Sequence, residues 1–216
     1  TLKHPKPLLK IGSETLLSNT LKFLELFEIK DVVINVHYLG EQIFNYVKNN
    51  KFNLNIIIVR EKNKILDTGG GVLNAINYFL NEPFLIINPD TIWNSYYLKE
   101  LKLMEKTLFE HEKNKCSLLV VNKKKSFDKS FKGDFNLKNN SVNRKDIANL
   151  NYIYTGLQII KPEVFSGLSE EVFSINKVWN KLIQKNELYG MESNIRFLHV
   201  STLDIYKKLL KKYFKH

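Results

Sequence analysis

Three short segments of the sequence carry residues suited to binding phosphate or a metal ion. The first contains Asp90, which follows the apolar run Phe84-Leu85-Ile86-Ile87 and so lies just beyond the end of an expected buried strand. A carboxylate in that place can bind a hard cation such as Mg2+, which prefers oxygen ligands. An aspartate that only caps the following turn is the alternative, and the residue alone does not separate the two.

The other two segments could contact phosphate through backbone amides or through a lysine. Thr68-Gly69-Gly70-Gly71 follows an expected strand and opens an expected helix, where glycines let a ligand approach the backbone closely. It matches neither Gly-x-Gly-x-x-Gly nor the P-loop pattern, so a flexible turn is the alternative. In Pro5-Lys6-Pro7, two prolines predict an extended segment that fixes the lysine, which suits either a phosphate clamp or a surface loop.

Alternating strands and helices must position these segments. Apolar periodicity predicts helices over 14–27, 71–80, 95–111 and 175–185, and a last helix that begins at Thr202. Apolar or β-branched runs predict strands over 31–37, 54–59, 84–87, 117–121, 131–137, 152–160 and 195–200, with a polar loop over 138–149. The pattern predicts one α/β domain with a Rossmann-like, mixed but mostly parallel sheet, which binds ligands outside the carboxyl ends of its strands.

Charge and composition limit the possible partners. The chain has 216 residues, a net charge of +11 and one cysteine, Cys116. Only three of its basic residues are arginines, and the lysines are spread along the chain, so a lysine-rich background is favoured over a nucleic-acid site. The sequence shows no apolar run of about 20 residues and no signal-peptide pattern, so we expect a cytoplasmic protein with no membrane partner.

Several motifs follow one another in a fixed order along the chain. They are His4-Pro5-Lys6-Pro7-Leu8-Leu9, Val33-Ile34-Asn35-Val36-His37-Tyr38-Leu39-Gly40, Leu66-Asp67-Thr68-Gly69-Gly70-Gly71, Asn88-x-Asp90-x-x-Trp93, Gly133-Asp134-Phe135, Tyr154-Thr155-Gly156-Leu157-Gln158, Phe173-Ser174 and Val200-x-Thr202. Together they resemble the sugar-1-phosphate nucleotidyltransferases. Within that family the resemblance is strongest to the branch of bacterial N-acetylmuramate α-1-phosphate uridylyltransferases and mannose-1-phosphate guanylyltransferase-like proteins.

The resemblance implies an enzyme of nucleotide-sugar biosynthesis that makes a cell-wall precursor. A sugar 1-phosphate attacks the α-phosphorus of a nucleoside triphosphate, with UTP favoured, and pyrophosphate leaves. By matching motifs, Lys6 would contact the triphosphate, and Thr68, Gly69 and Gly70 the nucleobase. Asp90 would bind Mg2+, and the sugar phosphate would lie against Gly133, Asp134, Thr155 and Gly156. We expect residues 1–122 to form the nucleotide-binding half of the domain and 123–216 the sugar-phosphate-binding half.

Two departures from the family pattern shape these expectations. The family's first strand, which is central to its sheet, and its Gly-rich phosphate loop are absent before Thr1, so we expect about 20 residues to be missing from the sequence. His199 stands where the family has its second metal-binding aspartate, and imidazole suits softer metals than Mg2+. His199 is therefore either a metal ligand or a histidine bonded to its neighbours at a strand end.

These departures leave alternatives to a UTP-dependent enzyme. One is the specificity of a mannose-1-phosphate guanylyltransferase. Another is a non-catalytic homologue that binds a nucleotide sugar, and a third is a polyanion-binding protein, which the charge of +11 motivates. The sequence predicts neither the oligomeric state nor the identity of the base and the sugar.

Overall fold

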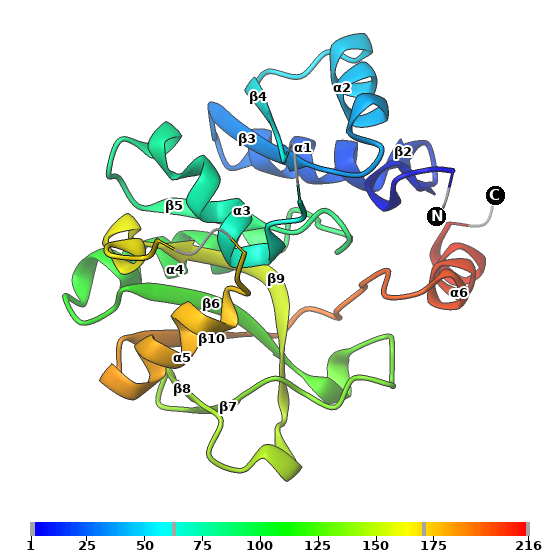
Figure 1. The fold of residues 1–216 in the computed structure, drawn as a ribbon. Coiled ribbons are helices and arrows are strands. Elements are labelled where there is room, and N and C mark those ends of the chain that lie inside the picture. The colour runs from blue at the N-terminus through cyan, green and yellow to red at the C-terminus, as the bar shows by residue number, and fades with distance from the viewer. Residues whose placement is uncertain (1–2, 62–63, 170–171, 215–216) are drawn as a thin grey trace.

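The computed structural model describes residues 3–61, 64–169 and 172–214 (Figure 1). Its strands are β1 (Lys10–Ile11), β2 (Glu14–Thr15), β3 (Asp31–Val36), β4 (Asn55–Arg60), β5 (Phe84–Ile87), β6 (Cys116–Asn122), β7 (Asn136–Lys138), β8 (Ser141–Asn143), β9 (Tyr152–Ile160) and β10 (Leu188–Ser193). Its α-helices are α1 (Leu16–Leu26), α2 (Gly40–Asn49), α3 (Asp67–Ala75), α4 (Tyr97–Glu110), α5 (Asn176–Lys185) and α6 (Leu203–Tyr213).

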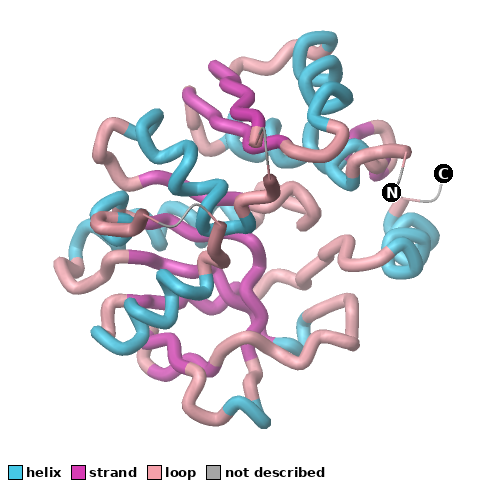
Figure 2. Tube along the Cα trace, in the orientation of Figure 1, coloured by secondary structure: helices cyan, strands magenta, loops and turns pink. Residues whose placement is uncertain are grey.

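The main sheet has six strands in the order β5-β9-β6-β10-β8-β7. β6 and β10 run parallel, whereas β9 runs antiparallel to both of its neighbours, β5 and β6. A second sheet consists of the parallel pair β3 and β4, and the strands of the two sheets form separate groups in Figure 2. The prediction of a mixed α/β fold is therefore confirmed, although the direction of β9 had no signal in the sequence.

Successive residues of β6 point to opposite faces of the main sheet and so bury two cores. Leu118 and Val120 pack with Trp179 of α5 and with the partly buried Val72 of α3. Leu119 faces the other way, into a core with Leu101 of α4. Helices thus cover both faces, which explains why β6 reads as a continuous apolar run rather than as an alternating one.

A cavity of about 1110 Å3 separates the two sheets. Its apolar part is lined by Leu21 and Leu24 of α1, Ile34 of β3, and Leu85 and Ile87 of β5. Neither β3 nor β5 pairs with another described strand on its remaining edge. No hydrogen-bonded pairing between described strands therefore joins the two sheets across the cavity.

Several predicted elements differ from those observed. Helix α3 already begins at Asp67, so the glycines 69–71 lie inside it and not in a loop before it. The polar segment 138–149 contains β8, and β10 had not been predicted. In place of the predicted strands over 131–137 and 195–200, the structure has β7 and only isolated bridges at Phe197 and His199. These segments are short and held by tertiary contacts, which override local propensity.

The last helix packs against the beginning of the chain, as Figure 1 shows. Thr202 caps α6 as predicted, because its hydroxyl oxygen accepts a hydrogen bond from the Ile205 amide at 3.2 Å. Leu209 is fully buried, and the Tyr206 hydroxyl donates to the Lys10 carbonyl at 2.6 Å. None of the helices in the described part of the chain has the length and hydrophobicity of a membrane span.

Candidate functional site

Lys6 and Asp90 meet at the end of β5. The Lys6 Nζ donates to the Asp90 Oδ2 at 2.6 Å, and both side chains are partly exposed. Lys6 is not in the predicted extended segment, because it begins a one-turn 3-10 helix over Lys6–Leu8 that is closed by a hydrogen bond from the Leu9 amide. Pro5 precedes this turn in an extended conformation and Pro7 lies within it, so the prolines still restrict the backbone that carries the lysine.

The second oxygen of the Asp90 carboxylate is buried and has no hydrogen-bond partner among the described residues. The Nδ1 atom of His199 lies 3.6 Å from this oxygen, Oδ1. A buried carboxylate oxygen without a partner carries a desolvation cost that a bound cation would remove. This oxygen therefore fits the predicted role of Asp90 in binding a metal ion.

His199 is held in an aromatic pocket beside Asp90. Its ring stacks on Phe197 with centroids 5.4 Å apart and contacts Phe131 at 5.8 Å. The Nδ1 atom also lies 3.3 Å from the Thr91 hydroxyl. Burial lowers the pKa of His199 below its usual value of 6.5, and this effect outweighs the attraction of Asp90. A neutral imidazole beside the carboxylate is the form that can bind a metal ion, but nitrogen is a poor ligand for Mg2+.

The lowered pKa of His199 predicts that the protein loses stability as the pH falls below 6.5. In that range the unfolded chain binds a proton that the folded chain binds less readily, so the free energy of unfolding decreases. We expect His199→Gln to make this decrease smaller between pH 7.5 and 5.5, as measured by urea unfolding. Equal pH slopes for the variant and the wild type would contradict the prediction.

Thr155 and Gly156 lie behind Asp90 in strand β9. The Thr155 hydroxyl donates to the Leu119 carbonyl at 2.9 Å, and the Thr155 carbonyl accepts from the Thr91 hydroxyl at 2.8 Å. Gly156 has a φ of +92°, and a Cβ there would lie 2.8 Å from the Cβ of Asn88. Both residues therefore fix the backbone around Asp90, and the hydroxyl of Thr155 is already used inside the fold.

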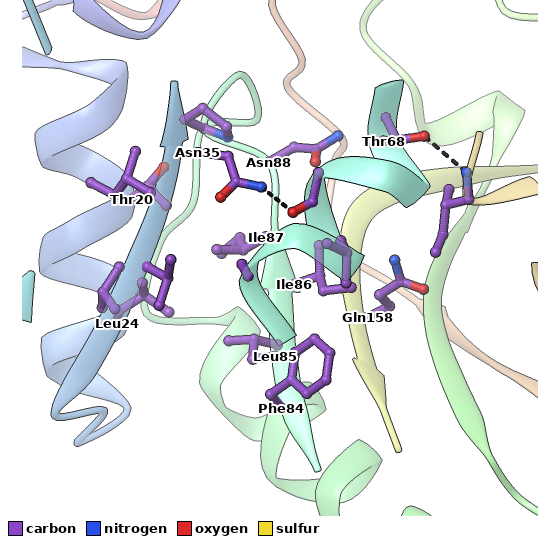
Figure 3. Close-up of a pocket in the computed structure, with 18 of the residues that line it drawn as sticks. Thr20, Leu24, Asn35, Thr68, Phe84, Leu85, Ile86, Ile87, Asn88 and Gln158 are labelled. Atoms are coloured by element: carbon purple, nitrogen blue, oxygen red, sulfur yellow. Dashed lines mark hydrogen bonds between the residues drawn. The ribbon is translucent and has the colours of Figure 1, made fainter. Parts of the chain in front are cut away.

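The glycine segment of α3 packs directly on Phe173. The amides of Gly69 and Gly70 donate to the Phe173 carbonyl at 2.9 and 3.0 Å, so neither amide is available to a ligand in this conformation. The hydroxyl oxygen of Thr68 accepts from the Ile175 amide at 3.0 Å (Figure 3). A ligand at this segment would therefore contact the surface and carbonyls of the helix rather than a cradle of free amides.

Gly133 and Asp134 lie beside β9, where the predicted sugar-phosphate segment runs. Gly133 has a φ of +100°, and the Asp134 amide donates to the Tyr152 carbonyl at 2.7 Å. One carboxylate oxygen of Asp134 accepts from the Tyr154 amide at 2.9 Å. Asp134 also lines the large cavity, which brings it into the same space as Thr68.

The cavity joins the two predicted substrate segments, but the Lys6–Asp90 pair is at its margin. Figure 3 shows Asn35 of β3 and Thr20 of α1 across the cavity from Ile87 and Asn88. Lys6, Asp90 and His199 are not among its lining residues, although their neighbours Pro7, Asn88 and Pro89 are. The site therefore has a charged cluster next to a large, mainly apolar space.

The structure also indicates residues that the sequence did not single out. Thr91 is fully buried and links Asp90, Thr155 and His199. Arg144 lines the cavity beside Asp134. A threonine directly after Asp90 was a visible signal, whereas Arg144 lies in a polar stretch that gave none. Within the described residues, no group of three or more His, Cys, Asp or Glu side chains could hold a metal ion.

Comparison with known proteins supports the resemblance. No protein-family model matches the chain. An N-acetylmuramate alpha-1-phosphate uridylyltransferase from Neisseria meningitidis is 27% identical over 202 residues, which cover 92% of this chain and 85% of that protein. The enzyme of the same name from Caulobacter vibrioides is 23% identical over 205 residues, covering 93% and 84% of the two chains.

A solved structure shares the fold. HddC from Yersinia pseudotuberculosis, complexed with GMP-PN, superposes with a TM-score of 0.74 at 20% sequence identity over 97% of this chain and 90% of that one. The fold and the relatives together define a nucleotidyltransferase. These relatives support the sugar-1-phosphate nucleotidyltransferase family, which the ordered motifs predicted.

Proposed function

We propose that the protein transfers a uridylyl group from UTP to a sugar 1-phosphate, with N-acetylmuramate 1-phosphate as the first candidate substrate. An oxygen of the sugar phosphate attacks the α-phosphorus of UTP. The bond from that phosphorus to the bridging oxygen of the β-phosphate breaks, and pyrophosphate leaves with the negative charge. Such a transfer depends on positioning and charge neutralisation rather than on a covalent enzyme intermediate.

The observation that carries the proposal is the Lys6–Asp90 pair at the end of β5, next to the cavity. Lys6 supplies positive charge for the triphosphate, and Asp90 provides a carboxylate whose buried Oδ1 is without a described partner. Thr68, Gly69 and Gly70 form the side proposed for the nucleobase. Gly133, Asp134, Thr155 and Gly156 form the side proposed for the sugar phosphate.

A divalent cation fits this arrangement at Asp90. Members of the family generally use a divalent metal, and Asp90, with His199 beside it, would hold the ion here. When bound, such an ion would supply positive charge against the triphosphate. Magnesium as the metal, a cytoplasmic location and a role in making a cell-wall precursor belong to the proposal.

UTP is favoured because the two bacterial relatives that span most of this chain are uridylyltransferases. GTP is the second candidate, since mannose-1-phosphate guanylyltransferase subunits are 24 to 26% identical over 89% of the chain. Those relatives are about twice as long, because the matched region covers 54 and 52% of them.

The test is pyrophosphate release by the full-length protein with magnesium. We expect the highest kcat/KM with UTP and N-acetylmuramate 1-phosphate, compared with GTP and mannose 1-phosphate. Highest activity with the second pair would favour the guanylyltransferase. Binding of UDP-sugars by calorimetry without turnover of any pair would instead identify a non-catalytic homologue.

A further inference from the structure

Arg144 is built into the wall of the cavity on the side of Asp134. It directly follows β8, and its guanidinium carbon lies 4.4 Å from the ring centroid of Phe135, which is fully buried. The ring of Phe135 packs edge-on against Trp179 of α5 at 5.7 Å. The guanidinium is thus stacked on a rigid aromatic pair, which restricts its position.

Three uncharged oxygens accept hydrogen bonds from the guanidinium and so fix its orientation. Its Nε donates to the Asp134 carbonyl at 3.2 Å, Nη1 to the Asn180 Oδ1 at 2.6 Å, and Nη2 to the Asn176 Oδ1 at 2.5 Å. A guanidinium has five N–H donors, so these three bonds leave two N–H groups for another acceptor. The two asparagines orient the group without neutralising its charge.

Arg144 forms no ion pair with a described carboxylate, where an ion pair is a nitrogen–oxygen distance of 4.0 Å or less. Arg60 provides a contrast within the same chain, because it also stacks on a phenylalanine, Phe44, but pairs with Glu41 at 2.5 Å. Desolvation lowers the pKa of Arg144, and the nearby charge of Asp134 only partly opposes it. A partly desolvated, oriented guanidinium without an ion-pair partner is suited to an anionic ligand.

We propose that Arg144 binds an oxyanion of the sugar 1-phosphate substrate. This inference rests on the proposed function, since it takes the cavity beside Asp134 to be the sugar-phosphate side. Two sources of the oxyanion share this chemistry. One is the 1-phosphate that every substrate of the reaction carries, and the other is a carboxylate on an acidic sugar.

Calorimetry with four small ligands distinguishes a phosphate from a carboxylate as the oxyanion that Arg144 binds. Glucose 1-phosphate carries only the phosphate, glucuronic acid only the carboxylate, glucuronic acid 1-phosphate both, and glucose neither. We expect Arg144→Gln to weaken binding of at least one oxyanion-bearing ligand about 10- to 100-fold, the range for losing a charged hydrogen-bond pair. A loss with glucose 1-phosphate assigns the phosphate, and a loss confined to the two acidic sugars assigns the carboxylate.

Two further variants test whether any loss of affinity comes from the positive charge of Arg144. Asn180→Asp keeps the shape and the acceptor for Nη1 but adds a carboxylate, so it should weaken oxyanion binding without removing any contact. Asn180→Asp also replaces Arg144→Gln as the test if a thermal melt shows that Arg144→Gln is unfolded. Arg60→Gln removes the same charge from the stacked arginine outside the cavity and should leave the affinities unchanged.

The inference is overturned if both Arg144→Gln and Asn180→Asp bind all four ligands as the wild type does, or if the wild type binds none of the oxyanions. Pyrophosphate release, measured on the same proteins, tests the proposed function separately. Turnover with an unchanged KM for the sugar phosphate in Arg144→Gln would overturn only the role of Arg144. Binding that depends on Arg144 in a protein without turnover would overturn only the catalytic function.

Discussion

Replacing Asp90 with asparagine is expected to lower kcat/KM about 100- to 1000-fold while leaving the melting temperature nearly unchanged. The range is that for removing one group that stabilises developing charge in a transition state. Asparagine keeps the size of the side chain and an oxygen that can accept the hydrogen bond from Lys6, now made at 2.6 Å. It removes the negative charge that would balance a bound cation. Because the Lys6–Asp90 pair is partly exposed, its loss costs little stability.

The control for this prediction is Asp204→Asn, in the exposed first turn of α6. It removes the same charge away from the cluster and should leave turnover at the wild-type level. Pyrophosphate release gives the rate, and circular dichroism gives the melting temperature. Undiminished turnover in Asp90→Asn would remove Asp90 from the site, and a large drop in its melting temperature would assign it a structural role instead.

Gly133→Ala is expected to reduce the free energy of unfolding by about 2–5 kcal/mol, the combined range for backbone strain and overpacking. Gly133 has a φ of +100°, which a residue with a side chain rarely adopts. A Cβ there would lie 2.4 Å from the carbonyl oxygen of Leu150 and 2.7 Å from its carbonyl carbon. Backbone atoms cannot rotate away as a side chain can, so the chain next to Asp134 must shift.

Gly167→Ala isolates the contribution of the clash. Gly167 also has a positive φ, +74°, but a Cβ there would meet no atom within 4 Å. We expect it to show only the strain, about 1–2 kcal/mol, when both variants are unfolded in urea. Equal losses for Gly133→Ala and Gly167→Ala would show that the contact with Leu150 has no energetic effect.

The fold was predictable where apolar periodicity is strong and local. The run 117–121 reads as a buried strand because helices cover β6 on both faces, and α4 and α5 follow from the spacing of residues such as Leu101 and Trp179. β10 contains Gly190 and Glu192, which weaken a strand signal, and it forms because β6 supplies a full set of parallel pairs. Such pairing depends on a partner 72 residues away, from Leu188 to Cys116, and short windows of sequence do not contain it.

The sequence singled out Asp90 and Lys6 as candidate site residues, but it did not predict the hydrogen bonds that other candidate residues make. Asp90 stood out because a carboxylate followed an apolar strand, and the structure brings it to Lys6. The glycines 69–70 were expected to offer free amides, yet both amides bond to Phe173, which lies more than 100 residues later. The sequence did not indicate Arg144, because its orientation depends on two asparagines of α5 that lie more than 30 residues later in the chain.

The contacts of the charged cluster have a consequence for folding kinetics. The Lys6–Asp90 hydrogen bond joins residues 84 positions apart, and the Thr91–His199 contact joins residues 108 apart. Long loops must close before such contacts form, and this entropic cost slows folding. We therefore expect the contacts of this cluster to form late in folding. During synthesis, β6 and β9, which lie beside Asp90, are both available only after residue 160 has emerged. Asp90 can meet His199 only after residue 199 has emerged.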